Sequence, residues 1–341
     1  DEAYLKTLYD QSIWLVFIDP VVDLEYFQET SENLVIVHYS DQLSSSNHYD
    51  AITVTNKSKQ YYSVIEEFFA KQGIAFPKEN LDQVIKTFNT FNGEWLLRAV
   101  QGVGHDQREK MSIVAAIKFM LIELNEQHDI LWVPISMEEI VRVAGNVRLN
   151  KKDGIFSSKL IGQKGSLSDD LLMIGIKRDE NKLYMHLYPI EVKIGHNPTE
   201  VIKKGTQQVT NLTKALKQEL MMNTGFEAKF LRNFFAKLFI VNARKMEVNA
   251  FWPEKSYKLD EKTVELLLND NFVVTEEHQA AFNIGAIVSF RKDAHVKSKD
   301  TYNDVTVYDI PERISYKAIG MTIEELKKDD YSHVTLIEPT Q

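Results

Sequence analysis

The segment from residue 170 to residue 194 constrains the fold more than any other part of the chain. Two apolar runs, 171–176 and 183–194, are separated by the polar residues 177–182. Short runs rich in Leu, Ile and Val are typical of buried strands, and a short polar connection between two of them favours an antiparallel hairpin. Helical periodicity precedes and follows this segment. The chain is therefore expected to be α/β, of the mixed α+β kind, with the hairpin inside a sheet that helices cover.

Composition excludes several classes of protein. The 341 residues are 44% hydrophobic and 26% charged, with a net charge of −9, which suits a folded chain of two or three domains. No apolar run approaches the ~20 residues of a membrane helix, and the start of the chain, 1–4, lacks the basic and apolar regions of a signal peptide. The chain contains no cysteine, which excludes disulfide scaffolds and thiolate metal sites. We expect a cytoplasmic protein without a membrane partner, and the absence of an initiator Met suggests a fragment of a longer chain.

The periodicity divides the chain into three expected parts. These are an N-terminal α/β domain over 1–108, a central domain over 109–250 and a C-terminal α/β region over 251–341. Besides the hairpin, the pattern predicts strands at 13–18, 34–39, 51–55, 130–133, 271–274, 286–290 and 305–307. It predicts helices at 62–70, 81–91, 94–100, 111–124, 136–145, 196–222, 228–243 and 322–328.

Charge is unevenly distributed along the chain. Residues 1–50 contain ten acidic residues and one lysine, whereas 191–250 contains ten Lys and Arg against five Glu. A basic face on this second segment could follow nucleic-acid phosphates, and solvated helix faces explain the same composition equally well. The acidic first segment suits a surface that docks another protein.

Chemistry is most strongly indicated on the second strand of the hairpin. Side chains alternate along a strand, so Glu191 and Lys193 should share one face while Ile190, Val192 and Ile194 occupy the other. The apolar flanks imply burial, where a charged pair is unfavourable unless it binds something. A cross-strand salt bridge would also explain the Glu-x-Lys pattern.

A second carboxylate is expected nearby. Asp170 stands at the head of the first hairpin strand and could lie across from Glu191. Two such carboxylates suit Mg²⁺ or Mn²⁺, which would polarise a phosphoryl oxygen and lower the pKa of a bound water. Lys193 would orient that water or stabilise charge in the transition state. These residues predict metal-dependent hydrolysis of a phosphodiester.

The arrangement resembles the PD-(D/E)XK nuclease superfamily, which has an acid at one strand's start, a hairpin, and Glu-x-Lys on the next strand. Asp170 matches the first acid because two leucines follow it, and Glu191-Val192-Lys193 is an intact triplet. Asp169 takes the place of the family's proline, which makes it a rival metal ligand. The resemblance implies a restriction-endonuclease-like core within 109–250 and a deoxyribonuclease activity.

Nucleases of this kind often add a Glu from the preceding helix and a Gln or Lys from the following one. On the helix that Ser136 begins, Glu138 flanks the apolar face, whereas Glu139 points away and can cap the helix. On the later helix, Gln208 and Lys204 border the buried stripe, and Gln207 lies outside it. The predicted catalytic residues are Asp170, Glu191, Lys193 and Gln208, and the predicted metal ligands are Asp170, Glu191 and Glu138.

A narrower resemblance covers nearly the whole chain. Five segments look like the large, ATPase-linked subunit of bacterial DNA-phosphorothioation-dependent restriction systems: 17–24, 38–42, 49–55, 92–98 and 133–139. The resemblance implies restriction of DNA that lacks the phosphorothioate mark, together with partner subunits. The chain contains no Gly-x-x-x-x-Gly-Lys-Ser/Thr loop, so the ATPase is expected outside it.

Two other interpretations compete with a nuclease. The first is a catalytically inactive nuclease fold that binds DNA or assembles subunits. The second is a different enzyme, but the nine histidines show no metal-ligand spacing and no Gly-x-Ser-x-Gly motif occurs. His196 is better explained as the start of a helix than as a catalytic base.

Overall fold

The computed structural model describes residues 2–18, 22, 24–27, 34–39, 51–102, 105–126, 129–138, 140, 170–180 and 182–328. Asp169, the rival metal ligand, and Glu139, the predicted helix cap, lie outside these residues, as do residues 141–145 of the predicted helix at 136–145. Asp170 is described through its backbone pairing.

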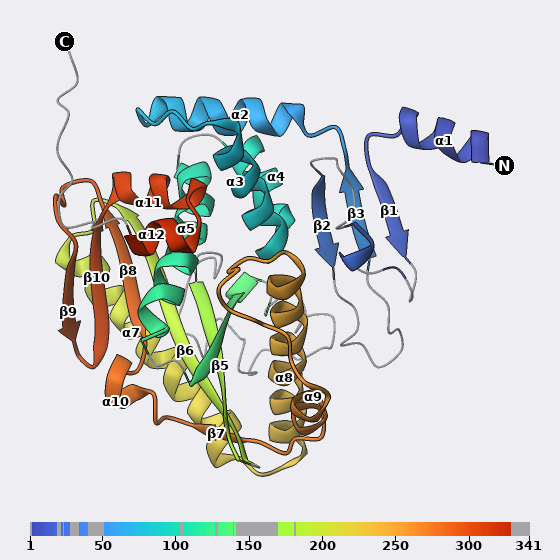
Figure 1. The fold of residues 1–341 in the computed structure, drawn as a ribbon. Coiled ribbons are helices and arrows are strands. Elements are labelled where there is room, and N and C mark those ends of the chain that lie inside the picture. Colours follow the sequence, from blue (N-terminus) through green and yellow to red (C-terminus); the bar gives the residue numbers. More distant parts are fainter. Residues whose placement is uncertain are drawn as a thin grey trace.

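A seven-stranded mixed sheet forms the centre of the molecule (Figure 1). Its order is β4-β5-β6-β8-β10-β9, with β7 paired to β6. The strands β4, β5 and β6 are antiparallel neighbours, whereas β8 and β10 run parallel to β6. The strands are β4 (Ile130–Ser136), β5 (Asp170–Asp179), β6 (Lys182–Gly195), β7 (Val273–Thr275), β8 (Ala286–Arg291), β9 (Ser298–Tyr302) and β10 (Val305–Pro311).

Helices cover both faces of this sheet (Figure 1). One face carries α5 (His105–Leu124), and α11 (Glu312–Gly320) packs on α5. The other face carries α7 (Thr199–Lys217), which packs on β6 and β8. The long helix α8 (Phe226–Val248) packs beside β4. Apolar side chains from all of these elements form one continuous core.

A separate three-stranded sheet lies toward the N-terminus (Figure 1). Its order is β1-β3-β2, formed by β1 (Leu15–Ile18), β2 (Val35–Tyr39) and β3 (Ala51–Thr55). The Asn89 side chain fixes β2 to the helices, because it accepts from the Ile36 amide at 3.0 Å and donates to the Leu34 carbonyl at 2.9 Å. Asn89 belongs to α3 (Lys78–Phe91), which also contacts β4, so α3 joins the two sheets.

The remaining described helices are α1 (Glu2–Gln11), η1 (Leu24–Phe27), α2 (Lys59–Lys71), α3 (Lys78–Phe91), α4 (Gly93–Gln101), the π-helical turn η2 (Gln218–Met222), α9 (Glu261–Leu268), α10 (Gln279–Phe282) and α12 (Ile323–Lys328). The periodicity did not predict α1, α9, α10, α11 or β9. In β9 all five residues are exposed, so no apolar alternation marks it.

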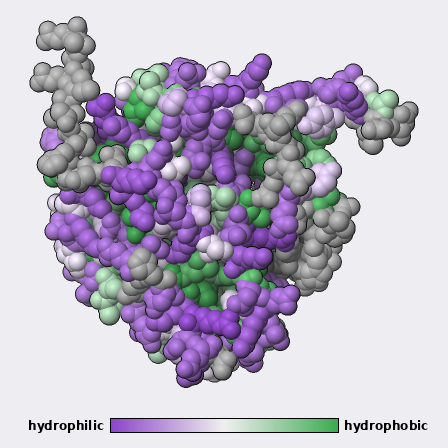
Figure 2. All heavy atoms as spheres, viewed as in Figure 1, coloured by the Kyte–Doolittle hydropathy of each residue, from purple (hydrophilic) through white to green (hydrophobic). Residues whose placement is uncertain are grey.

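The expected mixed α/β class is confirmed. The three predicted domain ranges stay a prediction, and both the large sheet and its core continue across the boundary at 250. Among the helices that the structure describes, none combines the length and apolarity needed to cross a bilayer. Hydrophilic side chains predominate on the face drawn in Figure 2.

Candidate functional site

Glu191 and Lys193 lie on the face of β6 that α7 covers. Only 2% of Glu191 is exposed, whereas the Lys193 side chain is 23% exposed, and its Nζ donates a hydrogen bond to Glu191 Oε1. Ile190 and Val192 point to the opposite face and are buried in the main core. The predicted alternation is therefore confirmed, and the pair has one buried end and one end open to solvent.

The β5–β6 pairing places Asp170 directly opposite Glu191. Residues that oppose each other in an antiparallel pair have Cβ atoms about 4.5–5.5 Å apart. The backbone thus brings together the two acids that the sequence suggested.

Gly205 allows α7 to approach this pair closely. A Cβ at position 205 would lie 3.5 Å from Glu191 Cγ and 3.1 Å from Ile287 Cδ1. Gln208 follows three residues later, on the same side of the helix. Its Oε1 is buried and accepts no hydrogen bond from any described residue. Gln208 therefore carries an unused acceptor close to the helix face that meets Glu191.

Two other polar residues of α7, Gln207 and Lys204, point toward solvent. Gln207 is exposed and donates to Asn211 at 2.7 Å, and Lys204 is exposed as well. The difference between Gln207 and Gln208 agrees with the helical positions predicted from the buried stripe. Lys204 remains accessible to an anion in solvent.

Three polar residues at this face were not predicted. Ser289 on β8 pairs with Lys193, and Asp309 on β10 pairs with Ser289, so a polar row crosses three strands. Asn197 donates to Ser289 Oγ at 2.9 Å. Asp309 Oδ1 is buried without a hydrogen-bond partner in the described part of the chain. A polar residue inside an otherwise largely apolar strand was the available signal, but the sequence does not show which strands are neighbours.

Glu138 has partners on other elements. Its carboxylate forms ion pairs with Arg98 at 2.5 Å and Lys110 at 3.7 Å, and it accepts from Trp95 Nε1 at 3.2 Å. Because Ser136 pairs with Leu171, Glu138 follows β4 at the end of the sheet where β5 starts. Its contacts stabilise the junction of β4 with α4 and α5. Its predicted role as a metal ligand stays a prediction.

The donors at the site are oxygen atoms of the kind that hard cations prefer. Glu191 supplies a carboxylate, Asp170 is its cross-strand neighbour, and Gln208 Oε1 is an unused amide oxygen. Mg²⁺ takes one or two carboxylates and keeps several waters. The chemistry of this donor set fits Mg²⁺ or Mn²⁺. Within the described part of the chain, no three or more His, Asp or Glu side chains are grouped so that they could hold a metal ion by themselves.

Known proteins add no further constraint on this site. No protein-family model matches the chain, and neither the curated proteins nor the solved structures include a significant match. The interpretation of the site therefore depends on its own geometry and on the motif in the sequence.

Proposed function

We propose that the chain is the metal-dependent deoxyribonuclease part of a bacterial restriction complex, which hydrolyses phosphodiester bonds in DNA that lacks the phosphorothioate mark. The observation that supports this most is the register pairing of Asp170 with Glu191, with Lys193 on the same face as Glu191. An acid, a second acid and a lysine gathered at one end of a hairpin are what the nuclease motif requires.

Each residue has a separate role in this proposal. Asp170 and Glu191 would hold a divalent cation, which when bound would supply Lewis acidity toward a phosphoryl oxygen. Lys193 is the more exposed member of its pair, so its ammonium can donate to the attacking water or to a nonbridging phosphate oxygen. Gln208 can turn its unused Oε1 toward that water and fix its orientation.

The proposed substrate and partners are supported by the family resemblance and by the distribution of charge. Lys204, exposed on the helix that covers Glu191, offers a cation to a DNA phosphate. The partner subunits and the ATPase would lie outside this chain, and the acidic N-terminal segment would suit contact with a basic partner surface.

The test is plasmid cleavage with Mn²⁺ by the full chain together with its partner subunits. Glu191→Gln and Lys193→Met should each reduce the cleavage rate by about a hundredfold or more, because each removes a group that acts on the reacting phosphate. Matched controls come from the exposed pair Glu200 and Lys203 on α7, whose Nζ–Oε1 distance is 3.2 Å. Glu200→Gln and Lys203→Met should leave the rate unchanged.

The folded state of each variant is checked by thermal melting before rates are compared. Wild-type rates in both Glu191→Gln and Lys193→Met would rule out the proposed active site. Equal loss in the two control variants would show a general effect of charge on DNA binding instead.

A catalytically inactive module for DNA binding or subunit assembly is the second candidate. It is favoured by the internal partners of the acids, because Glu191 is paired with Lys193, and Glu138 contacts Arg98 and Lys110. Calorimetric titration with Mn²⁺ separates the two candidates. Heat of binding that Glu191→Gln abolishes supports the nuclease, and its absence in the wild type supports the inactive module.

A further inference from the structure

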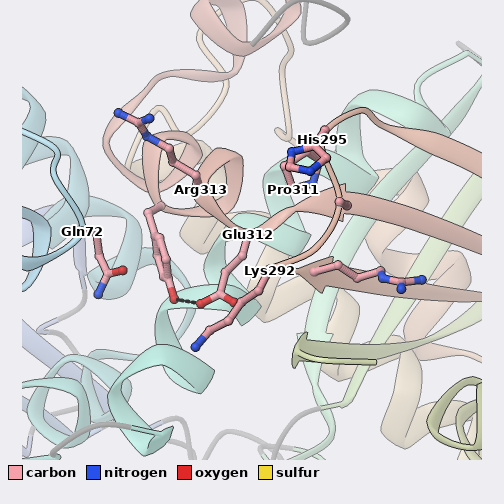
Figure 3. A pocket seen from close by; sticks show the side chains of 9 residues that line it. Gln72, Lys292, His295, Pro311, Glu312 and Arg313 are labelled. Atoms are coloured by element: carbon pink, nitrogen blue, oxygen red, sulfur yellow. Dashed lines mark hydrogen bonds between the residues drawn. The ribbon is translucent and has the colours of Figure 1, made fainter. Parts of the chain in front are cut away.

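A pocket opens at one end of the large sheet, beyond the candidate site. It has a volume of about 410 Å³ and lies where β8 and β10 end and α11 begins, with Gln72, the residue after α2 (Lys59–Lys71), on the opposite wall (Figure 3). The strands β6, β8 and β10 are parallel, so their carboxyl ends meet here. Ligands of open α/β sheets bind in the crevice at this end of the strands.

The pocket is rich in positive charge. Arg291, Lys292 and Arg313 line it, together with His295. Arg291 is partly neutralised, because it pairs with Asp293 at 2.7 Å and with Asp309 at 3.4 Å.

Two of these cations are available to a ligand. Lys292 and Arg313 are exposed and form no ion pair with any residue that the structure describes. The N-terminus of α11, a helix of nine residues, adds partial positive charge beside them. The entrance therefore favours an anion.

The floor of the pocket carries a different kind of group. Glu312 is 6% exposed, and its Oε1 accepts from Arg108 Nη2 at 2.7 Å and from the Tyr316 hydroxyl (Figure 3). Its second oxygen, Oε2, is buried and accepts nothing from the described residues. Buried acceptors are nearly always satisfied. Glu312 lines the pocket, so a turn of its side chain would present Oε2 to a ligand, and a ligand with an anionic end and a hydrogen-bond donor would suit both Oε2 and the exposed cations.

We propose that this pocket binds a nucleotide. Lys292 and Arg313 would contact the phosphate, and Glu312 Oε2 would accept a hydrogen bond from an N–H of the base or an O–H of the sugar. The volume lies within the roughly 300–1,000 Å³ range of ligand pockets. Sulfate would fill only part of it and would leave Glu312 Oε2 without a donor.

The pocket adjoins the strand of the candidate active site. Gly195 at the end of β6 pairs with Arg291, and its carbonyl accepts from the Lys292 amide at 3.2 Å. Two residues along a strand span about 6.6 Å, which separates Gly195 from Lys193. The nucleotide could therefore be free in solution or belong to the DNA strand that lies across the proposed active site, and only the second source rests on the proposed function.

Calorimetric titration of the full chain without divalent metal tests this proposal. The ligands are the four 2′-deoxynucleoside 5′-monophosphates and sulfate, which is an anion without a hydrogen-bond donor at neutral pH. At least one nucleotide should bind about tenfold or more tightly than sulfate. The double variant Lys292→Ala/Arg313→Ala changes two exposed side chains and should lose binding of both kinds. Lys317→Ala, at an exposed position of α11 that does not line the pocket, should bind as the wild type does.

The variant Glu312→Gln distinguishes recognition of the hydrogen-bond donor of the ligand from recognition of its phosphate. It should weaken nucleotide binding without weakening sulfate binding, because sulfate makes no use of the carboxylate as an acceptor. Nucleotide binding that is no tighter than sulfate binding, or that survives the double variant, would overturn the proposal even if Glu312→Gln fails to fold.

A short fluorescein-labelled single-stranded DNA distinguishes the two sources. If the nucleotide displaces this DNA and the double variant loses DNA binding, the pocket binds a nucleotide of the DNA strand. Nucleotide binding without displacement assigns it to a free nucleotide. Glu191→Gln should bind the nucleotide normally, so an inactive catalytic site would not affect this result.

Discussion

The Nδ1 atoms of His186 on β6 and His278 at the start of α10 lie 3.2 Å apart in the core. Both residues are at most 2% exposed, and neither Nε2 has a hydrogen-bond partner in the described structure. One Nδ1 must donate and the other accept, so at least the accepting ring is neutral. Burial lowers the pKa of His186 to about 4 and that of His278 to about 3.

This pair predicts acid sensitivity of the fold. The folded-state pKa values lie below the unfolded value of about 6.5, so the stabilising neutral state is fully present above pH 6.5 and is progressively lost as the pH falls toward 4. Between pH 7.5 and 5.5 the free energy of unfolding should fall by roughly 1.4 kcal/mol for each histidine. Urea unfolding at the two pH values measures this difference.

The double variant His186→Phe/His278→Phe should show a smaller difference between the two pH values, because neither position then titrates. Substitution of the exposed His196 by Gln should preserve the wild-type difference. An unchanged difference in the double variant would assign the acid sensitivity to other groups.

Gln208→Leu should lower the activity without lowering the stability of the protein. It removes a buried acceptor that has no described partner, so we expect the free energy of unfolding to stay constant or to rise by about 1 kcal/mol. The rate of Mn²⁺-dependent cleavage should fall by about tenfold or more, because the water loses its orienting group. Gln207→Leu, which changes the exposed neighbour, is the control and should alter neither quantity. Full activity in Gln208→Leu would remove Gln208 from the proposed site.

Lys118→Met should weaken the junction of α5 with α11. The Lys118 ammonium donates to the carbonyls of Ile319 and Met321, each at 2.7 Å, and to that of Ala318 at 3.2 Å. These carbonyls end α11, where a cation is favourable and where loss of the donor leaves buried acceptors unsatisfied. We expect a loss of about 3 kcal/mol in the free energy of unfolding. Lys317→Met, at an exposed position on the same helix, should change it by less than about 0.5 kcal/mol.

Arg108→Leu should destabilise the protein more than the double variant Arg108→Leu/Glu312→Leu. Arg108 Nε and Nη2 donate to Glu312 Oε1 at 3.0 and 2.7 Å, and the single change leaves a buried carboxylate without its cation. The expected loss is about 3–5 kcal/mol, part of which the second substitution restores. Denaturant unfolding of the wild type, both single variants and the double variant gives the coupling energy. Additive losses would show that the two side chains do not depend on each other.

The hairpin shows how much a local pattern can predict. The sequence runs that indicated strands at 171–176 and 183–194 became β5 and β6, and the two strands are longer than the runs because polar residues continue the pairing at both ends. Alternation along β6 correctly placed Glu191 and Lys193 on one face. The same reasoning on α7 correctly distinguished Gln208 from Gln207, since a helical position relative to an apolar stripe fixes burial.

Elements without an apolar pattern were missed. In β9 every residue is exposed, because the strand is at the sheet edge and pairs only with β10. The helix α11 follows Pro311 directly, and its buried residues surround it rather than forming a stripe. It packs on α5 and α3 and beside the ends of β8 and β10, which explains this composition, and no local signal shows that environment.

The sequence by itself determined the mixed α/β class, the hairpin and the face on which Glu191 and Lys193 lie, because these properties depend on side-chain periodicity over a few residues. Only the tertiary structure decided that Ser289 and Asp309 continue the polar row beyond Lys193, and that Glu138 is held by Arg98 and Lys110. It also placed Glu312 beneath the basic pocket. Those relationships depend on which strands become neighbours and on how helices dock on them. The free energy that stabilises this arrangement comes from contacts throughout the core, and no single segment of the sequence contains it.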